Sequence, residues 1–215
     1  MLARLKKGLT NFKDVTYKKY EQLYQELGQA QNPHTLFIAC SDSRVDPERL
    51  IDSEPGEVFM IRNIANTIPT YELSQRDLTT VSSVEFAVEV LGVKEIIVCG
   101  HSNCGGCAAA LGGREKLDHL PFTQKYLEPL ESVKEKIEKN HAHEDDNAKA
   151  RLMELLNIIE QVEHLKTYPW IKQKIENGEL GIEGWHYDIK TGSVLVYDEA
   201  TDAFHESEKY QNEQE

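Results

Sequence analysis

The chain has 215 residues, enough for one domain with a substantial hydrophobic core, so we expect a single domain over residues 1–215. Its 37 Asp and Glu residues outnumber its 24 Lys and Arg residues, and the formal net charge of -13 argues against nucleic acid and anionic membrane surfaces as partners. No apolar stretch is long enough to cross a membrane and no leader-peptide pattern opens the sequence, so we expect a cytoplasmic protein.

The first half of the sequence predicts a helical arm followed by alternating strands and helices. The arm covers residues 1–30, where apolar side chains recur at roughly helical spacing among charged ones. A periodic segment at 79–91 predicts a helix, and a helix of small residues is expected to begin near Cys104. Buried strands are predicted from three short apolar runs, at 35–39, 57–62 and 95–99. This order predicts an α/β fold with a mostly parallel central sheet flanked by helices.

The second half predicts a long helix and a β-hairpin. One apolar stripe at helical spacing is formed by Ala148, Leu152, Leu155, Ile159, Val162 and Leu165. Two runs rich in strand-forming residues flank the turn at 190–192, which predicts a hairpin that adds an antiparallel edge to the sheet. We expect His141 and His143 to lie in a solvated loop and residues 203–215 to form an acidic tail.

Candidate metal ligands follow two of the predicted strands. Of four cysteines, three lie between 99 and 107, a pattern unlike that of small disulfide-rich secreted domains. Cys40 follows the first strand, while His101 and Cys104 follow the third, and ligands of parallel sheets bind beyond the carboxyl ends of strands. Thiolate and imidazole suit zinc, and three protein ligands leave one position open for water. Taken alone, His101 is more often a hydrogen-bonded turn histidine and Cys40 more often a small buried hydrophobe.

Three sequence blocks resemble the β-class carbonic anhydrases, namely CSDSRVDPERL at 40–50, PGEVFMIRNIAN at 55–66 and CGHSNCGG at 99–106. The blocks stand in the family's order and at similar spacings. The resemblance implies a zinc lyase that converts carbon dioxide reversibly to bicarbonate and a proton by zinc-bound hydroxide, with one Zn²⁺ per subunit held by Cys40, His101 and Cys104. It also implies a homodimer or a dimer of dimers, with active sites at the interface and the N-terminal arm packing on a partner subunit.

The resemblance assigns further roles around the metal. Asp42 and Arg44 match the family's catalytic dyad, in which a bidentate arginine holds the carboxylate off the metal so that it orients the zinc-bound water. The family's substrate-binding positions fall here on Gln31, Phe59, Ile64, Phe86 and Gly105. Many relatives have tyrosine in place of Phe86, so this chain lacks that hydroxyl. Without the resemblance, these side chains are ordinary core or polar residues.

One departure from the family pattern concerns regulation. Some bacterial members bind bicarbonate at an inhibitory site that uses a tryptophan three residues before the first zinc cysteine, together with an arginine and a tyrosine. Here the tryptophan position is Phe37, while Arg62 and Tyr187 occupy the other two. Because Phe37 has no indole N–H donor, we expect a weak or absent inhibitory site and the open, plant-like form with Asp42 paired to Arg44.

Two other classes of function are open to the sequence. Cys104 and Cys107 form a CxxC at a strand-to-helix junction, which is typical of thiol–disulfide oxidoreductases, but this hypothesis leaves Cys40, Asp42 and Arg44 unexplained. A zinc-scaffolded binding protein without catalysis would be indicated by a missing ligand or a broken dyad, and neither occurs in the sequence.

Overall fold

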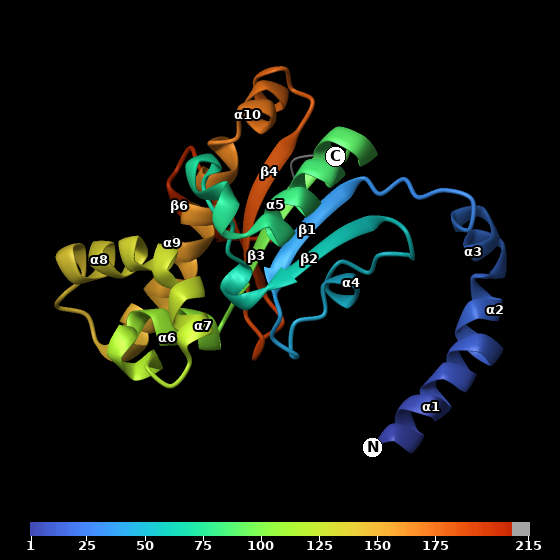
Figure 1. Ribbon diagram of the computed structural model, residues 1–215, viewed down its shortest axis with the longest axis horizontal. Helices are drawn as coiled ribbons and strands as arrows, with labels where there is room; N and C mark the ends of the chain where they lie inside the picture. The colour runs from blue at the N-terminus through green and yellow to red at the C-terminus, as the bar shows by residue number, and fades with distance from the viewer. Residues whose placement is uncertain (208–215) are drawn as a thin grey trace.

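Four parallel strands and two antiparallel ones form a single twisted sheet in the order β2-β1-β3-β4-β5-β6 (Figure 1). The computed structural model describes residues 1–207. The strands are β1 (Thr35–Cys40), β2 (Val58–Asn63), β3 (Glu95–His101), β4 (Gly181–Tyr187), β5 (Val194–Asp198) and β6 (Ala203–Glu206). The three predicted strands and the mostly parallel α/β fold are therefore confirmed.

Helices connect and cover the strands. In chain order the α-helices are α1 (Leu2–Asn11), α2 (Tyr17–Lys19), α3 (Glu21–Leu27), α4 (Pro47–Leu50), α5 (Leu78–Glu85), α6 (Gly105–Leu111), α7 (Pro121–Tyr126), α8 (Glu131–Asn140), α9 (Asp146–Lys166) and α10 (Pro169–Glu176). Shorter or wider helical turns are η1 (Phe12–Thr16), η2 (Ile64–Asn66), η3 (Tyr71–Arg76), η4 (Phe86–Leu91), η5 (Arg114–Leu117) and η6 (Glu128–Leu130). Since η4 continues α5 and Gly92 ends it in the left-handed conformation, the helix predicted at 79–91 is confirmed.

The main core lies between the sheet and the helices α5 and α9. Side chains alternate between the two faces of a strand, so every second residue of β1 and β3 points toward these helices. The residues of this core include Leu36, Ile38, Val84, Val88, Ile96, Val98, Ile158 and Val162. Gly100 and Gly184 bring α9 close to the sheet, because a Cβ atom at either position would lie 2.7 Å from the side chain of Ile158. The opposite face is covered by α4 and carries a smaller core around Phe37 and Cys99.

A third cluster covers the carboxyl ends of the central strands. It joins α6, α8 and the first half of α9, and its fully buried members include Leu130, Val133, Ile137 and Met153. In Figure 1 these helices gather on one side of the sheet, beyond the ends of β1 and β3. This end of the sheet is the place where the predicted metal ligands lie.

The predicted C-terminal hairpin is confirmed, because β4 and β5 pair antiparallel across the turn at 188–193, and β6 adds a strand that was not predicted. Strand β4 is parallel to β3, and the antiparallel edge consists of β5 and β6. Residues 203–206, predicted as the start of an acidic tail, instead form β6, which pairs antiparallel with β5 and packs Phe204 on Tyr197 with their ring centroids 5.3 Å apart. The rest of the predicted tail, 208–215, lies outside the described residues.

The buried face of α9 also differs from the predicted apolar stripe. Val162 and Leu165 are buried as predicted, but the other buried positions are Met153, Glu154, Asn157, Ile158 and Gln161, whereas Leu152, Leu155 and Ile159 are only half-buried. The helix is therefore rotated toward its polar side chains. These side chains are accepted in the interior because each finds a hydrogen-bond partner there.

The predicted N-terminal arm is helical from Leu2 to Leu27 and contains no buried residue. Figure 1 shows it, in dark blue, extending away from the sheet. Leu5, Leu9 and Phe12 are all exposed along it. Across residues 1–207, no helix combines the length and the apolar sequence that a membrane crossing needs.

Candidate metal centre and active site

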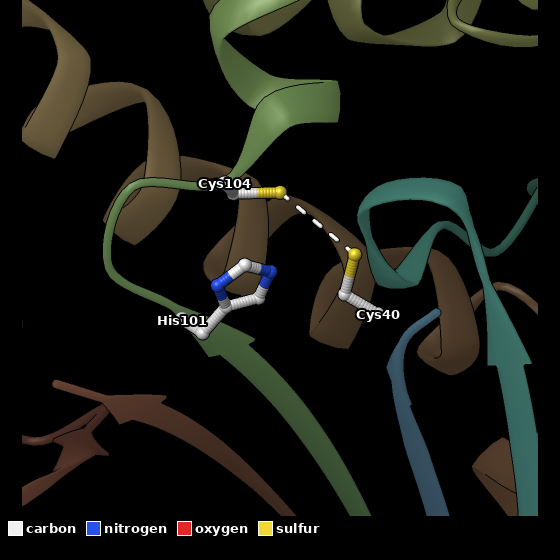
Figure 2. A group of neighbouring side chains, drawn as sticks. All are labelled: Cys40, His101 and Cys104. Atoms are coloured by element: carbon white, nitrogen blue, oxygen red, sulfur yellow. Dashed lines mark hydrogen bonds between the residues drawn. The ribbon is translucent and has the colours of Figure 1, made fainter. Parts of the chain in front are cut away.

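Cys40, His101 and Cys104 converge beyond the ends of two neighbouring parallel strands (Figure 2). Cys40 is the last residue of β1, His101 is the last residue of β3, and Cys104 is the N-cap residue directly before α6. All three are buried, and their ligand atoms lie within 4.8 Å of one another. The two Sγ atoms are 4.0 Å apart. The structure thus brings together the three residues that the sequence predicted as metal ligands.

The hydrogen bonds of His101 leave one ring nitrogen free for a metal ion. Its Nδ1 lies 3.0 Å from the carbonyl oxygen of Ser102. Since a carbonyl oxygen only accepts, Nδ1 carries the proton and Nε2 carries the lone pair. This Nε2 is buried and has no hydrogen-bond partner within residues 1–207. A buried unpaired nitrogen beside two thiols fits a thiophilic cation such as zinc.

The environment of the thiols favours their neutral form in the absence of a cation. A hydrogen bond with Cys104 and burial raise the pKa of Cys40 to about 12. A hydrogen bond with Cys107 and burial do the same for Cys104, whose pKa is raised to about 12. Burial lowers the pKa of His101, but interactions with Cys40 outweigh it and leave the pKa raised. A divalent cation would supply the positive charge that two buried thiolates need.

Asp42 and Arg44 form a bidentate ion pair beside this group. Arg44 Nε and Nη2 donate to the two carboxylate oxygens of Asp42 at 2.9 and 2.7 Å. These hydrogen bonds hold the pKa of Asp42 well below its usual range. Oδ2 of Asp42 is 4.0 Å from Nε2 of His101, so the carboxylate faces the metal group. Arg44 also donates to the carbonyl oxygen of Asn103 at 2.9 Å and thereby links the two ligand-bearing loops.

Arg62 fixes the loop that carries the dyad. Its guanidinium donates to the carbonyl oxygens of Cys40, Asp42 and Val45 at distances between 2.6 and 3.1 Å. Phe37, at the position of the family's regulatory tryptophan, is fully buried and packs edge-on against Trp185 with ring centroids 5.9 Å apart. Arg62 is therefore occupied by backbone groups, and Phe37 offers no donor.

A hollow of about 410 Å³ is lined by Ser41, which follows Cys40 in the chain, and by residues at the end of β2 and in α5. Its lining includes Ser41, Asn63, Ile64, Thr80 and Tyr126. Ile64 is 43% exposed. Of the predicted substrate-binding side chains, Ile64 is the one that lines this hollow.

The other predicted substrate-binding residues have different positions in this chain. Phe59 pairs with Leu36, four residues before Cys40, which places it about 13 Å along the strand from the metal group. Phe59 and Phe86 pack together with ring centroids 6.1 Å apart. Gln31 is exposed between α3 and β1. Within residues 1–207, no hydrogen bond joins Gln31 to the metal group.

Gly105 begins α6 directly after Cys104, and its backbone is exposed at the site. The next residue, Gly106, makes the close contact that holds α6 in place. A Cβ atom at Gly106 would lie 2.9 Å from the side chains of both Ala65 and Ile64. The paired glycines therefore allow the start of α6 to approach the turn that carries Ile64.

The sequence analysis missed polar residues of α9 that hold the loops of the site. Glu154 accepts a hydrogen bond from the backbone of Cys104, and Asn157 donates to the carbonyl oxygen of Ala65. Gln161 accepts from the backbone of Ile68. These three positions lie three and four residues apart, so they share one face of the helix. This polar periodicity is visible in the sequence and could have indicated that the face is buried against polar groups.

Comparisons with known proteins agree with this geometry. The family model described as carbonic anhydrase matches residues 35–194, which include all three metal-binding residues. A carbonic anhydrase of Pseudomonas aeruginosa is 41% identical over 199 residues, covering 92% of this chain and 88% of that protein. The solved structure of the β-carbonic anhydrase CcaA matches with a TM-score of 0.91 and 34% identity, over 95% of this chain and 98% of that chain. A structure of tetrameric β-carbonic anhydrases from Sordaria macrospora matches with a TM-score of 0.79 and 28% identity, over 91% of this chain and 95% of that chain.

Proposed function

Because the chain belongs to the β-class carbonic anhydrases, it catalyses the reversible hydration of carbon dioxide to bicarbonate and a proton, and we propose that Cys40, His101 and Cys104 hold its zinc ion. The observation that carries this proposal is the convergence of two buried thiols on the unpaired Nε2 of His101. When bound, zinc supplies a water molecule whose pKa is lowered to about 7.

Asp42 orients the reacting water in this proposal. Its carboxylate is kept ionised by Arg44 and faces the metal group, so it accepts one hydrogen of the water and directs the lone pair toward the substrate. Arg44 prevents Asp42 from reaching the metal as a further ligand. The bidentate pair therefore favours the open form of the site near neutral pH.

The substrate pocket is proposed to be completed by a second copy of the chain. Ile64 lines the hollow that includes Ser41, but Phe59 and Phe86 lie one strand length away from the metal group in the same chain. Gln31 lies close in sequence to the extended arm. A homodimer or a dimer of dimers would bring Gln31, Phe59 and Phe86 of the partner subunit to the site, where Gly105 offers its N–H group to a substrate oxygen. The Sordaria macrospora relatives are tetrameric.

We also propose that this chain lacks the inhibitory bicarbonate site of some bacterial relatives. Phe37 has no donor, and the guanidinium of Arg62 is already bound to three carbonyl oxygens. An incoming bicarbonate would have to displace these bonds. Bicarbonate added at rising concentration should therefore slow CO2 hydration only as a reaction product does, with hyperbolic rather than cooperative inhibition.

Zinc content and stopped-flow CO2 hydration, measured on the same preparations, test the proposed metal centre. The native chain should bind one zinc ion per subunit and hydrate CO2, whereas Cys104→Ser should lose most of both. Full activity in Cys104→Ser, or an active native protein without zinc, would show that the reaction occurs elsewhere.

A further inference from the structure

A buried carboxylate and a buried histidine lie directly behind the metal ligands. Glu154 of α9 is 6% exposed and His186 of β4 is fully buried. Oε2 of Glu154 and Nε2 of His186 are 3.1 Å apart, and Oε1 of Glu154 accepts from the backbone N–H of Cys104 at 3.2 Å. The dyad does not include these residues, and the reaction has no step for them.

The direction of these hydrogen bonds fixes the carboxylate from two sides. A carboxylate accepts, so Nε2 of His186 donates to it, and the backbone of Cys104 donates to the other oxygen. Moving an ionised carboxylate into a protein interior costs several kcal/mol unless such partners compensate. The Glu154 carboxylate is therefore held in one orientation by His186 of β4 and the backbone of Cys104.

Two hydrogen bonds from opposite sides hold the loop before Cys104. Asn103 is exposed and adopts the left-handed conformation with φ 57°, which asparagine adopts more readily than most residues other than glycine. Its carbonyl oxygen is held by Arg44 from the solvent side, and the next N–H is held by Glu154 from the interior. These two bonds fix the peptide between Asn103 and Cys104, from which Sγ of Cys104 points toward Cys40.

We propose that Glu154 is a positioning residue, held in place by His186, that fixes Cys104 in its metal-binding orientation. The proposal rests on the zinc site proposed above. Partners that orient metal ligands typically change metal affinity by about 10–100-fold when they are removed. Glu154 would thus act on the metal through the backbone of Cys104, without touching the substrate.

Two substitutions of Glu154 test whether zinc binding depends on its hydrogen bond to Cys104 or only on the volume of its side chain. Glu154→Leu keeps a similar volume but leaves the Cys104 N–H without an acceptor, whereas Glu154→Gln keeps an amide oxygen that can accept it. By competition with a chelator, the zinc Kd of Glu154→Leu should rise by about 10–100-fold, and that of Glu154→Gln should stay close to the native value. The thiolate-to-metal absorption bands of the cobalt-substituted protein should shift in the leucine variant alone.

Glu160→Gln is the matched control, because it removes a carboxylate from the same helix where Glu160 bonds to Ser132 and Lys136. It should lower stability without changing the zinc Kd or the cobalt spectrum. If Glu154→Leu does not fold, His186→Leu replaces it, since this change frees the carboxylate while leaving its bond to Cys104 possible, and it should weaken zinc binding in the same direction.

These measurements separate the positioning role of Glu154 from the existence of the zinc site itself. A native zinc Kd and an unshifted cobalt spectrum in Glu154→Leu, or a native Kd in His186→Leu, would overturn the positioning role while leaving the metal site intact. A native protein that binds no zinc at this site would overturn both. If zinc binding were weakened as much in Glu154→Gln as in Glu154→Leu, the positioning role would also be overturned. The amide oxygen of glutamine would then accept the hydrogen bond of Cys104 without preserving zinc affinity.

Discussion

Asp42 is the residue whose removal should affect chemistry most and metal binding least. It touches the metal group only through the 4.0 Å approach of Oδ2 to His101, and Arg44 holds it in place by two hydrogen bonds. A positioned acceptor of this kind contributes about 10²–10⁴-fold to the rate, so Asp42→Ala should lower kcat by about 10²-fold or more at unchanged zinc content. Stopped-flow CO2 hydration measures the change.

The adjacent Asp46 gives the control for that substitution. Asp46 and Arg49 form an exposed ion pair of 3.0 Å in the same segment, and such surface pairs contribute little. Asp46→Asn should leave kcat and KM unchanged. A rate in Asp42→Ala equal to that of Asp46→Asn would rule out the orienting role.

Cys107 decides between zinc chemistry and thiol–disulfide exchange. It is a buried free thiol of α6 that accepts a hydrogen bond from Asn157 at 3.7 Å. Cys107→Ser keeps an acceptor of similar size, so CO2 hydration should remain near the native rate. An oxidoreductase using Cys104 and Cys107 would lose its activity in the same variant, and an insulin-reduction assay on both proteins would detect it.

The sequence predicted the residues of the metal group but not those that hold them. Cys40, His101 and Cys104 are recognisable because metal ligands must be of particular chemical types at the ends of strands. Arg62 and Glu154 bond to backbone groups that are distant in sequence, His186 bonds to the side chain of Glu154, and an arginine, glutamate or histidine in those patterns has many ordinary roles. Only the packing of α9 and β2 against the loops shows which role each has.

At the scale of elements, the junction of α8 and α9 predicts a dependence of stability on pH. Hydrogen bonding to His164, together with Lys136 and Ser132, outweighs burial and lowers the pKa of Glu160 to about 2. Because the pKa of the folded state is depressed, the stabilisation is fully present above the pKa of the unfolded carboxyl, about 4.3, and is lost as pH falls through about 2. The expected contribution near neutral pH is about 1–3 kcal/mol.

Urea unfolding of the native chain and of Glu160→Gln checks this dependence. The free energy of unfolding of the variant should be lower by that amount at about pH 6, and the difference should shrink as the pH falls from about 4.5 toward 2. A difference that stays constant through this range would show that the interactions of ionised Glu160 with His164, Lys136 and Ser132 make no pH-dependent contribution.

Strands that are marked by a short apolar run were predicted well. Elements whose burial depends on contacts with residues distant in sequence were not. Short β-branched runs gave β1, β2 and β3 nearly to the residue, because a buried parallel strand is apolar on both faces. The apolar residues of α9 occur all around the helix, so its most buried face depends on polar contacts to Cys104, Ala65 and Ile68. Strand β6 was missed because it is only four residues long and its pairing with β5 is a tertiary contact.

At the scale of the whole molecule, the exposed arm predicts that assembly depends on its apolar side chains. Burying a leucine contributes about 1.5–3 kcal/mol, so losing Leu5 and Leu9 from an interface would cost about 3–6 kcal/mol for each arm. The double variant Leu5→Glu, Leu9→Glu should therefore shift the protein toward monomers in light scattering coupled to gel filtration. Lys6→Glu together with Lys13→Glu changes the charge of the arm more and should leave the assembly intact. A dimer that persists in the leucine variant would place the interface elsewhere.

The most direct test of the central claim is a zinc titration of the metal-free protein followed by its CO2 hydration rate. If Cys40, His101 and Cys104 form the catalytic metal centre, the rate rises from near zero in proportion to added zinc and stops rising at one equivalent per chain, while His101→Ala shows no such rise. Substantial hydration before zinc is added, or a native titration curve in His101→Ala, would contradict the account.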